Sequence, residues 1–262
     1  PGNKALRISP SKPACGEEFF KHLQTGSFSE AVKKCSGEEE PKPKKKDLFS
    51  ALAELRKDRK KYRRKGEIAC FSYLRHNYFS KQVERSGSAK IIPYKGTVIE
   101  LQPRAKIYLS GNTDLEIGAD KIKGSKAETY LRLGKGAKWY AKRGGRISYL
   151  STLEIHDDAV FDSGYFTMNV RSTIVVDKKV SFGEDVMLAR NVIVYDSDFH
   201  QLQNDKGEQK NPPKEVTVGN HVWLGADSMV LKGVTIGQDS MVAAKTIVNR
   251  DVPERSLVTA WL

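Results

Sequence analysis

A six-residue period governs the apolar positions in the second half of the chain. Every sixth residue is apolar in two runs, and the segment between the runs is polar and contains two adjacent prolines. The positions are Val176, Phe182, Leu188, Val194, Val218, Leu224, Val230, Ile236, Val242 and Val248. An α-helix has a period of about 3.6 and a strand a period of about two, so neither produces this spacing.

A coil of short parallel strands explains the period. Four residues after most of these positions lies another small or β-branched residue, as at Val180, Val222 and Val234. Three six-residue units make one triangular coil, and stacked coils bury a continuous apolar column. Gly or Ala often comes directly after the apolar residue of a six-residue unit. Such small residues permit bends that larger side chains would obstruct. The predicted fold class is all-β, a parallel β-helix, because an alternating sandwich would not sustain the six-residue step.

The same coil is expected to extend upstream in a less regular form. Short β-prone segments such as TVIEL and KIYLS alternate with Gly, Asp, Asn and Lys after Ile91. Ile155, Phe161 and Thr167 keep the six-residue step, which then slips by three residues before Val170. We therefore assign residues 88–262 to the β-helix domain.

Residues 47–87 are predicted to form a basic helical region. Asp47 is a candidate N-cap for a helix with apolar residues at helical spacing, and Gly66 is expected to interrupt it. A second helical stretch, Ile68–Phe79, is rich in aromatic residues. The apolar positions of the first helix are Leu48, Ala51, Leu52 and Leu55, and the aromatics of the second are Phe71, Tyr73, Tyr78 and Phe79. This region is either a cap packed on the β-helix or an interfacial anchor.

Residues 1–46 differ from the rest and their role stays open. They carry PSKP, an acidic EEE and PKPKKK, with short helical turns expected at Glu17–Leu23 and Ser29–Cys35 and a linker after them. The chain begins with Pro1, which leaves a removed signal peptide open. The three cysteines form no Cys-x-x-Cys pair, which favours reduced thiols and a cytoplasmic location.

The positive charge is concentrated in one segment. The net charge is +13, and Lys42–Lys65 contains twelve Lys or Arg residues against Asp47, Glu54 and Asp58. Such a run attracts anions, including phosphate or an acidic membrane face, although a solvated helix face is the simpler interpretation. We expect no nucleic-acid partner. No stretch reaches the roughly 18 apolar residues of a membrane span.

Two blocks of sequence resemble one family. VTVGNHVWLGADSMVLKGVTIGQDSMVAAKTIVNRDVPERSLV is similar to the signature of hexapeptide-repeat acyltransferases. FDSGYFTMNVRSTIVVDKKVSFGEDVMLARNVIVYDSDFH resembles the active-site half of sugar O-acetyltransferases, most closely those of capsular and other surface polysaccharides. The resemblance implies a left-handed β-helix, an exception to the usual right-handed crossover. It also implies a homotrimer that binds acetyl-CoA in a groove between subunits.

The resemblance assigns roles to particular residues. His200 matches the catalytic histidine, on an external loop expected over residues 200–215. Asn169 matches a residue that faces the acceptor sugar, with Tyr165 beside it in YFTMN. The implied donor-binding residues are Trp223, Gly225, Ala226, Ala243, Ala244, Lys245 and Arg250. Lys245 replaces a family glycine, and the ending TAWL departs from the family pattern.

The proposed chemistry needs a base. A sugar hydroxyl is a poor nucleophile at neutral pH, and histidine, with a pKa near 6.5, suits proton removal. Direct transfer requires no acyl-enzyme, and backbone N–H or amide donors would stabilise the oxyanion. Asp196 or Asp198 could fix the tautomer of His200, and the sequence does not choose between them.

Three alternatives use the same fold. A zinc-dependent carbonic anhydrase needs three clustered histidines, whereas His200 and His221 stand 21 residues apart, and His156 and His221 are expected to be exposed. A trimeric scaffold would not need DSDFH. An N-acetyltransferase of an amino sugar would need a nucleotide-binding domain. We therefore predict a metal-independent, acetyl-CoA-dependent O-acetyltransferase for a surface-polysaccharide precursor, peripheral to the inner face of the membrane.

Overall fold

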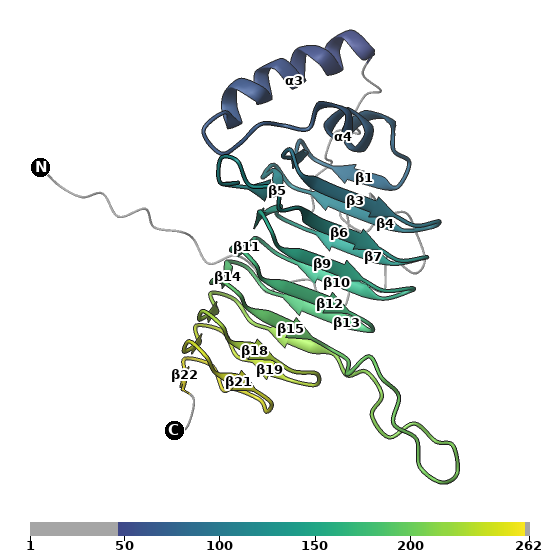
Figure 1. The fold of residues 1–262 in the computed structure, drawn as a ribbon, viewed down its shortest axis with the longest axis vertical. Helices are drawn as coiled ribbons and strands as arrows, with labels where there is room; N and C mark the ends of the chain where they lie inside the picture. Colours follow the sequence, from purple (N-terminus) through teal and green to yellow (C-terminus); the bar gives the residue numbers. More distant parts are fainter. Residues whose placement is uncertain (1–46, 260–262) are drawn as a thin grey trace, which may run out of the picture. The chain divides into compact units, whose positions relative to one another are not determined.

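Three parallel sheets wind around one apolar column (Figure 1). The computed structural model describes residues 47–259. The turns expected at Glu17–Leu23 and Ser29–Cys35, the linker up to residue 46 and the unusual end at Trp261–Leu262 lie outside these residues. Each turn of the coil contributes one strand to each sheet, and every strand pair named below is parallel.

The strands divide into three sets. The first sheet contains β1 (Val83–Ser86), β4 (Lys106–Ser110), β7 (Lys138–Ala141), β10 (Val160–Ser163), β13 (Lys179–Phe182), β16 (Val216–Val218) and β19 (Thr235–Ile236). The second sheet contains β2 (Ile91–Pro93), β5 (Leu115–Ala119), β8 (Gly145–Ser148), β11 (Phe166–Met168), β14 (Val186–Leu188), β17 (Trp223–Leu224), β20 (Met241–Val242) and β22 (Leu257–Val258). The third sheet contains β3 (Thr97–Leu101), β6 (Thr129–Leu133), β9 (Thr152–Ile155), β12 (Thr173–Val176), β15 (Ile193–Tyr195), β18 (Met229–Val230) and β21 (Ile247–Val248).

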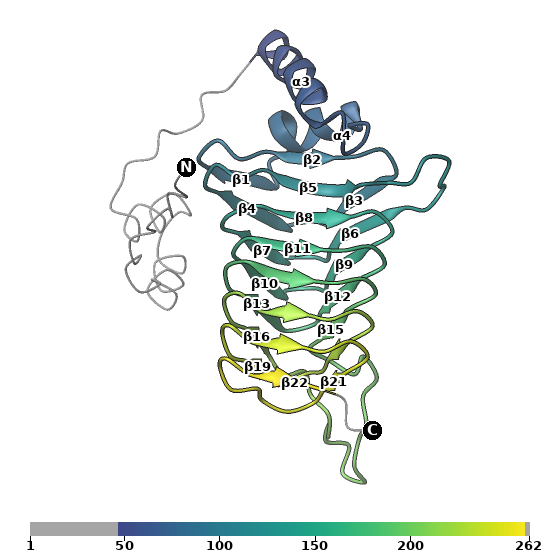
Figure 2. The same cartoon turned by 90° about the vertical axis from the view of Figure 1, so that its left-hand side faces the viewer.

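The coil is left-handed, as predicted. In Figure 2 the second sheet faces the viewer, its strands run from left to right, and each later strand lies lower. A chain that crosses the near face to the right while it descends turns in the left-handed sense. The all-β class and the handedness are therefore both confirmed.

The six-residue period is the inward face of the coil. All ten hexad positions are buried, and so are the residues four places after nine of them; the exception is Asp198, which follows Val194 and is exposed. In the last coils Val218 pairs with Ile236, Leu224 with Val242 and Val230 with Val248, so each partner lies eighteen residues further along the chain. Three hexads therefore make one coil.

Upstream the six-residue step fails, and the prediction for Thr167 was wrong. Thr167 is only half-buried, whereas its neighbours Phe166 and Met168 face the core. Leu131 pairs with Leu153, so this coil has 22 residues. The extra residues lengthen the corners, which shifts the inward positions out of a strict period.

Glycines near the corners let successive coils approach each other. A Cβ on Gly225 would lie 2.6 Å from the backbone nitrogen of Ala244, and one on Gly237 would lie 2.3 Å from that of Glu254. Neither glycine has a positive φ. Many of the tightly bent residues are non-glycine, for example Asp227 and Asp239, which adopt the left-handed conformation that Asp tolerates.

A helical cap covers the N-terminal end of the coil. Helix α3 (Leu48–Tyr62) begins as predicted, since Asp47 accepts a hydrogen bond from the backbone N–H of Ser50 at 2.7 Å. Ala51 and Leu55 are buried, whereas Leu48 is exposed, contrary to the helical-spacing prediction. Helix α4 (Cys70–Leu74) and the π-helix η1 (Arg75–Phe79) follow.

Buried polar contacts fix the cap to the first coils. Tyr73 donates its hydroxyl to Asp58 at 2.6 Å, and Lys90 reaches the same carboxylate at 2.7 Å. Tyr94 donates to Glu116 at 2.6 Å. If the tyrosine or lysine partner were lost, a buried carboxylate would be left unpaired. These contacts therefore favour a single placement of the cap on the first coils. The prediction of a packed cap is confirmed for Tyr73, but Phe71 and Phe79 are exposed.

Two isoleucines with opposite exposure test the inward assignment. Ile236 is fully buried in β19, whereas Ile122 is 64% exposed between β5 and β6. We expect Ile236→Ala to lower the free energy of unfolding by about 2–5 kcal/mol, because it leaves a cavity in the column. Ile122→Ala is the matched control and should change it by less than about 0.5 kcal/mol. Equal losses in a denaturant titration would contradict the assignment.

Candidate active site

An external loop interrupts the regular coil between β15 and β16 (Figure 1). It contains the predicted segment 200–215 and leaves and returns at one corner, where the N–H of Lys214 donates to the carbonyl of Asp196 at 2.9 Å. Further out, the N–H of Lys210 donates to the carbonyl of Leu202 at 2.7 Å. Val194 pairs with Val230, 36 residues later, so the loop adds the length of one complete coil.

Asp196 anchors the loop to the preceding coil. Its side chain is completely buried and accepts backbone N–H groups from Asp177, Lys178 and Lys179 at 2.7–2.8 Å. Burial raises the pKa of its carboxyl, and the three hydrogen bonds oppose that shift. Both carboxylate oxygens are occupied, so Asp196 acts on the backbone of the previous corner and does not contact His200.

Asp198 holds the loop through two residues that the sequence analysis did not single out. Its Oδ2 accepts a hydrogen bond from Lys232 at 2.5 Å and from the Asn211 amide at 2.9 Å. These bonds lower the pKa of the Asp198 carboxyl. Asn211 also donates to the carbonyl oxygen of His200 at 2.7 Å. Lys232 lies 34 residues from Asp198, on the next coil, and no local motif signals that contact.

His200 projects its imidazole toward solvent. The side chain is exposed and has no hydrogen-bond or ion-pair partner among residues 47–259. The preceding Phe199 has a positive φ of 59°, and its ring packs edge-on against Tyr195 and His156 with centroids 5.1 and 5.7 Å apart. These contacts hold a strained backbone turn, which directs His200 away from the coil.

A second histidine lies beside the base of the loop. His156 Nδ1 is 3.0 Å from the Asp177 carboxylate, and both side chains are half-buried. The two residues line a hollow with Arg132, Gly134 and Asp157. The expectation that His156 is simply exposed was therefore wrong, because Asp177 of the next coil partners it. His221 is exposed, as predicted.

The candidate acceptor residues do not lie together. Asn169 is exposed at the corner after β11, where its side-chain oxygen accepts the N–H of Val170 at 2.8 Å. Tyr165 lies before β11, where its N–H donates to Glu184 at 3.1 Å. The three residues of β11 separate the two, so one sugar ring would not contact both.

Five of the seven candidate donor residues gather on the same corner as Asn169, whereas Arg250 follows β21, at the other edge of the third sheet. Leu188 pairs with Met168 and Leu224, and Leu224 with Val242, which aligns the corners that follow β11, β17 and β20. Gly225 and Ala226 occupy the second of these corners, Ala243 and Ala244 the third. Lys245 and Arg250 line one hollow at the end of the coil. Trp223 is exposed on the outer face of β17.

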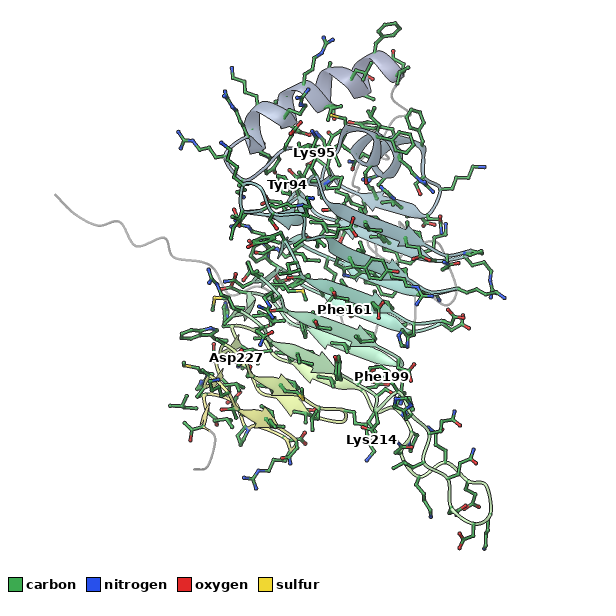
Figure 3. The ribbon with its side chains drawn as sticks, in the orientation of Figure 1. Tyr94, Lys95, Phe161, Phe199, Lys214 and Asp227 are labelled. Carbon is green, nitrogen blue, oxygen red and sulfur yellow. The ribbon has the colours of Figure 1, made fainter. Side chains whose placement is uncertain are left out.

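The donor corner and the histidine loop lie at opposite edges of the third sheet. Figure 3 shows Asp227, next to Ala226, at one edge and Phe199, next to His200, at the other. The strands of the third sheet span the distance between them. One protomer therefore does not bring His200 to its own donor corner.

Two outer faces of the coil carry rows of apolar residues, which lie outside the inward six-residue period. On the second sheet, Met187, Trp223, Met241 and Leu257 are in register. On the third sheet, Ile193, Met229 and Ile247 are in register. The corresponding row of the first sheet is polar, with Ser181, Thr217 and Thr235. Contiguous exposed apolar residues mark an interaction surface.

Residues 47–259 contain neither a cluster of metal-binding side chains nor a membrane-spanning helix. No group of three or more His, Cys, Asp or Glu side chains there is arranged to hold a metal ion. No helix in that range is long and apolar enough to cross a membrane.

Comparison with known proteins confirms the resemblance to hexapeptide-repeat acetyltransferases. Residues 215–250 match the bacterial transferase hexapeptide family (six repeats). The Galactoside O-acetyltransferase of Escherichia coli is 38% identical over 90 residues, which are 34% of this chain and 43% of that protein. The Polysialic acid O-acetyltransferase of Neisseria meningitidis is 41% identical over 66 residues, 25% of this chain and 31% of that protein. The chain thus spans less than half the length of these relatives.

The polysialic acid O-acetyltransferase OatWY aligns with 68% of this chain and 84% of its own, at 22% identity and a TM-score of 0.44.

The anchoring role of Asp196 can be tested by an isosteric change. Asp196→Asn keeps one acceptor oxygen but turns an amide N–H₂ toward backbone donors. We expect the free energy of unfolding to fall by about 1–3 kcal/mol, the cost of a buried donor without a partner. Asp205→Asn, on the exposed part of the loop, is the control and should change it little. Two indistinguishable denaturation curves would refute the anchoring role.

Proposed function

Because residues 215–250 carry the six-residue repeats of bacterial transferases, we propose that the protein is an acetyl-CoA-dependent O-acetyltransferase of a sugar hydroxyl. The observation that carries the proposal is the exposed imidazole of His200, held on a loop whose two ends are anchored in the coil. A base presented in this way can reach a hydroxyl of a large acceptor. The identity to a Galactoside O-acetyltransferase supports a sugar acceptor.

The reaction is a direct transfer. His200 takes the proton of the acceptor hydroxyl, and the oxygen attacks the thioester carbonyl. The new C–O bond forms as the C–S bond breaks, and the coenzyme A thiolate receives the proton from the imidazolium. No acyl-enzyme forms, and a positioned base contributes roughly 10²–10⁴-fold to the rate.

Asp198 is the positioning residue in this scheme. Both carboxylate oxygens of Asp196 accept backbone N–H groups, so Asp196 stabilises the corner and does not bind the imidazole of His200. Asp198 instead holds Asn211, which donates to the backbone of His200. The carboxylates thus act on the loop that carries the base.

The donor is acetyl-CoA, bound at the corner of Gly225, Ala226, Ala243 and Ala244. Gly225 is buried and lets the two coils approach closely, whereas Ala226 and Ala243 are half-buried and Ala244 is exposed, so this corner can present backbone to an extended pantetheine arm. Lys245 and Arg250 are both exposed cations and line the same hollow, which suits the phosphates at the nucleotide end. Trp223 would flank the thioester end.

A homotrimer completes the site. The apolar rows on the second and third sheets would pack against each other between neighbouring protomers, which closes a ring by a heterologous contact. The same packing would bring His200 of one protomer to the donor corner of the next. The polar outer row of the first sheet would remain in water.

The acceptor class we propose is a capsular or other surface polysaccharide, or its precursor. A Polysialic acid O-acetyltransferase among the relatives supports a polymeric sugar. The long projecting loop leaves room for such a chain. The exposed Cys70 suits a reducing compartment, so we place the reaction in the cytoplasm.

Replacing the base tests the proposal. We expect His200→Ala to reduce turnover by roughly 10²–10⁴-fold, because the hydroxyl loses its proton acceptor. The matched control is His221→Ala, which removes another exposed histidine and should retain turnover. The assay follows release of the coenzyme A thiol with galactosides and oligosialic acid as acceptors. Undiminished turnover of His200→Ala would remove the general-base role.

The product distinguishes the reaction types. A sugar ester loses its acetyl group in mild alkali, whereas an amide retains it. Alkali-stable product would favour N-acetylation, and a wild-type protein without turnover on any acceptor would favour a scaffold.

Mixed trimers test the shared site. His200→Ala and Trp223→Ala subunits, each nearly inactive alone, are co-expressed with different affinity tags and purified through both. If each site joins His200 of one subunit to Trp223 of the next, one of the three sites in every doubly purified mixed trimer contains both native residues, which is about a third of the sites. Activity should return to about that fraction of wild type. Mixed trimers as inactive as the parents would place both residues in one subunit.

A further inference from the structure

The outward face of helix α3 carries no apolar seam of its own. Ala51, Leu55, Asp58 and Tyr62 are buried and define the inward face. The opposite stripe at helical spacing holds Phe49, Ala53, Arg56 and Lys60, all exposed, and the exposed Arg64 follows just after the helix ends. The helix therefore uses one face to cap the coil and presents the other to an external partner.

The positive charge of this face is not neutralised within the described part of the chain. Arg56–Lys65 contains eight Lys or Arg residues and one acid, Asp58, which is buried and bound to Lys90. Lys61 and Lys65 pair with Asp114 and Glu116. The other six are exposed and form no ion pair within residues 47–259: Arg56, Lys57, Arg59, Lys60, Arg63 and Arg64.

Four of these cations surround one hollow. Arg56, Arg59, Lys60 and Arg63 line a space of about 580 Å³ together with Gly66, Glu67 and Ile68. The one acid in this lining, Glu67, forms an ion pair with Lys95 at 2.7 Å, so its charge is shared with a residue outside the hollow. A hollow with this lining suits a phosphate group, because guanidinium donors bind its oxygens in pairs.

The cap also exposes phenyl rings. Phe49 is 84% exposed, Phe71 79% and Phe79 61%, on α3, α4 and η1 respectively. Exposed phenyl rings have no stabilising contact in water, so three of them within one cap indicate a surface that is covered by a partner. Cations and phenyl rings on the same helical cap match a lipid interface, where phosphates lie beside acyl chains.

We propose that the α3 face docks the protein onto an anionic membrane surface. The six unpaired cations contact lipid phosphates, and Phe49, with Phe71 and Phe79, enters the interfacial layer. A single helix lies across the end of the coil in both Figure 1 and Figure 2, so its outward side can rest on a plane, whereas a strand of nucleic acid binds along an extended basic groove.

The arrangement leaves the candidate active site accessible. Helix α3 caps the N-terminal end of the coil, whereas the external loop projects toward the C-terminal end (Figure 1). A membrane at the cap therefore does not cover His200. The docking proposal does not depend on acetyl transfer, so either can fail alone.

Vesicle binding tests the proposal directly. The full chain is sedimented with vesicles of phosphatidylcholine, with and without 30% phosphatidylserine, at low and high salt. We expect binding that needs the anionic lipid and weakens at high salt, because surface charges are screened beyond about 10 Å at 0.1 M. Replacing Arg56, Arg59, Lys60 and Arg64 by Gln should weaken it about 100-fold or more, since each cation contributes about a fivefold factor.

A matched variant controls for net charge. Lys135→Gln, Lys138→Gln, Arg171→Gln and Arg190→Gln together remove the same charge from exposed positions on the coil and should bind vesicles nearly as the native protein does. Phe49→Ser should weaken binding about tenfold without changing its salt dependence. His200→Ala should bind normally, which separates docking from catalysis.

Three outcomes would overturn the proposal. The first is no difference between anionic and neutral vesicles for the native protein. The second is an equal loss for the cap and coil variants, which would reduce the effect to net charge. The third is cap-dependent binding to heparin or single-stranded nucleic acid without vesicle binding, which would assign the face to a soluble polyanion.

Discussion

Parallel pairing between successive coils is the constraint on which the structure depends. Each strand is only two to five residues long, so none is stable alone, and each coil buries its apolar residues only against the coils beside it. The register must bring an inward residue over an inward residue, as at Val230 and Val248. A shift of one residue would turn the whole apolar set outward. Corner length therefore matters as much as strand composition, because it sets where the next strand begins.

The external loop respects this constraint. It leaves after β15 and returns at β16, and Val194 still pairs with Val230 in the same sheet. A long insertion costs little entropy once its ends are held together, and here the carbonyl of Asp196 and the N–H of Lys214 join them. The chain can therefore place a polar, strained turn at this corner without disturbing the column. Phe199 packs against His156 of an earlier coil, and Asp198 accepts a hydrogen bond from Lys232 of the next coil. These two contacts explain how an exposed histidine can be held in a defined place.

The ends of the coil face a different problem. An open end exposes apolar side chains and unpaired strand edges, which invite aggregation. At the N-terminal end, α3 and α4 cover it, and the contacts of Asp58 and Glu116 with tyrosine and lysine fix the cover in place. Because one face of α3 satisfies this structural need, its other face is free to evolve a charge pattern of its own. Stability and recognition are thus divided between the two sides of one helix.

The sequence alone determined the column, because the six-residue period reports which side chains face inward within a regular coil. It also located the cap at Asp47 and the loop that begins at DSDFH. It did not determine the upstream register, since corners of variable length moved Thr167 outward and Met168 inward. It did not distinguish Asp196 from Asp198 as the support of His200. In the structure Asp196 binds the backbone of the preceding coil, and Asp198 binds Lys232 of the next coil. The pairing of His156 with Asp177, the contact of Lys232 with Asp198 and the apolar rows around Trp223 join residues that are 18 to 36 positions apart. Such contacts depend on how coils stack, which is a property of the corners and of the tertiary structure, and no local pattern encodes it.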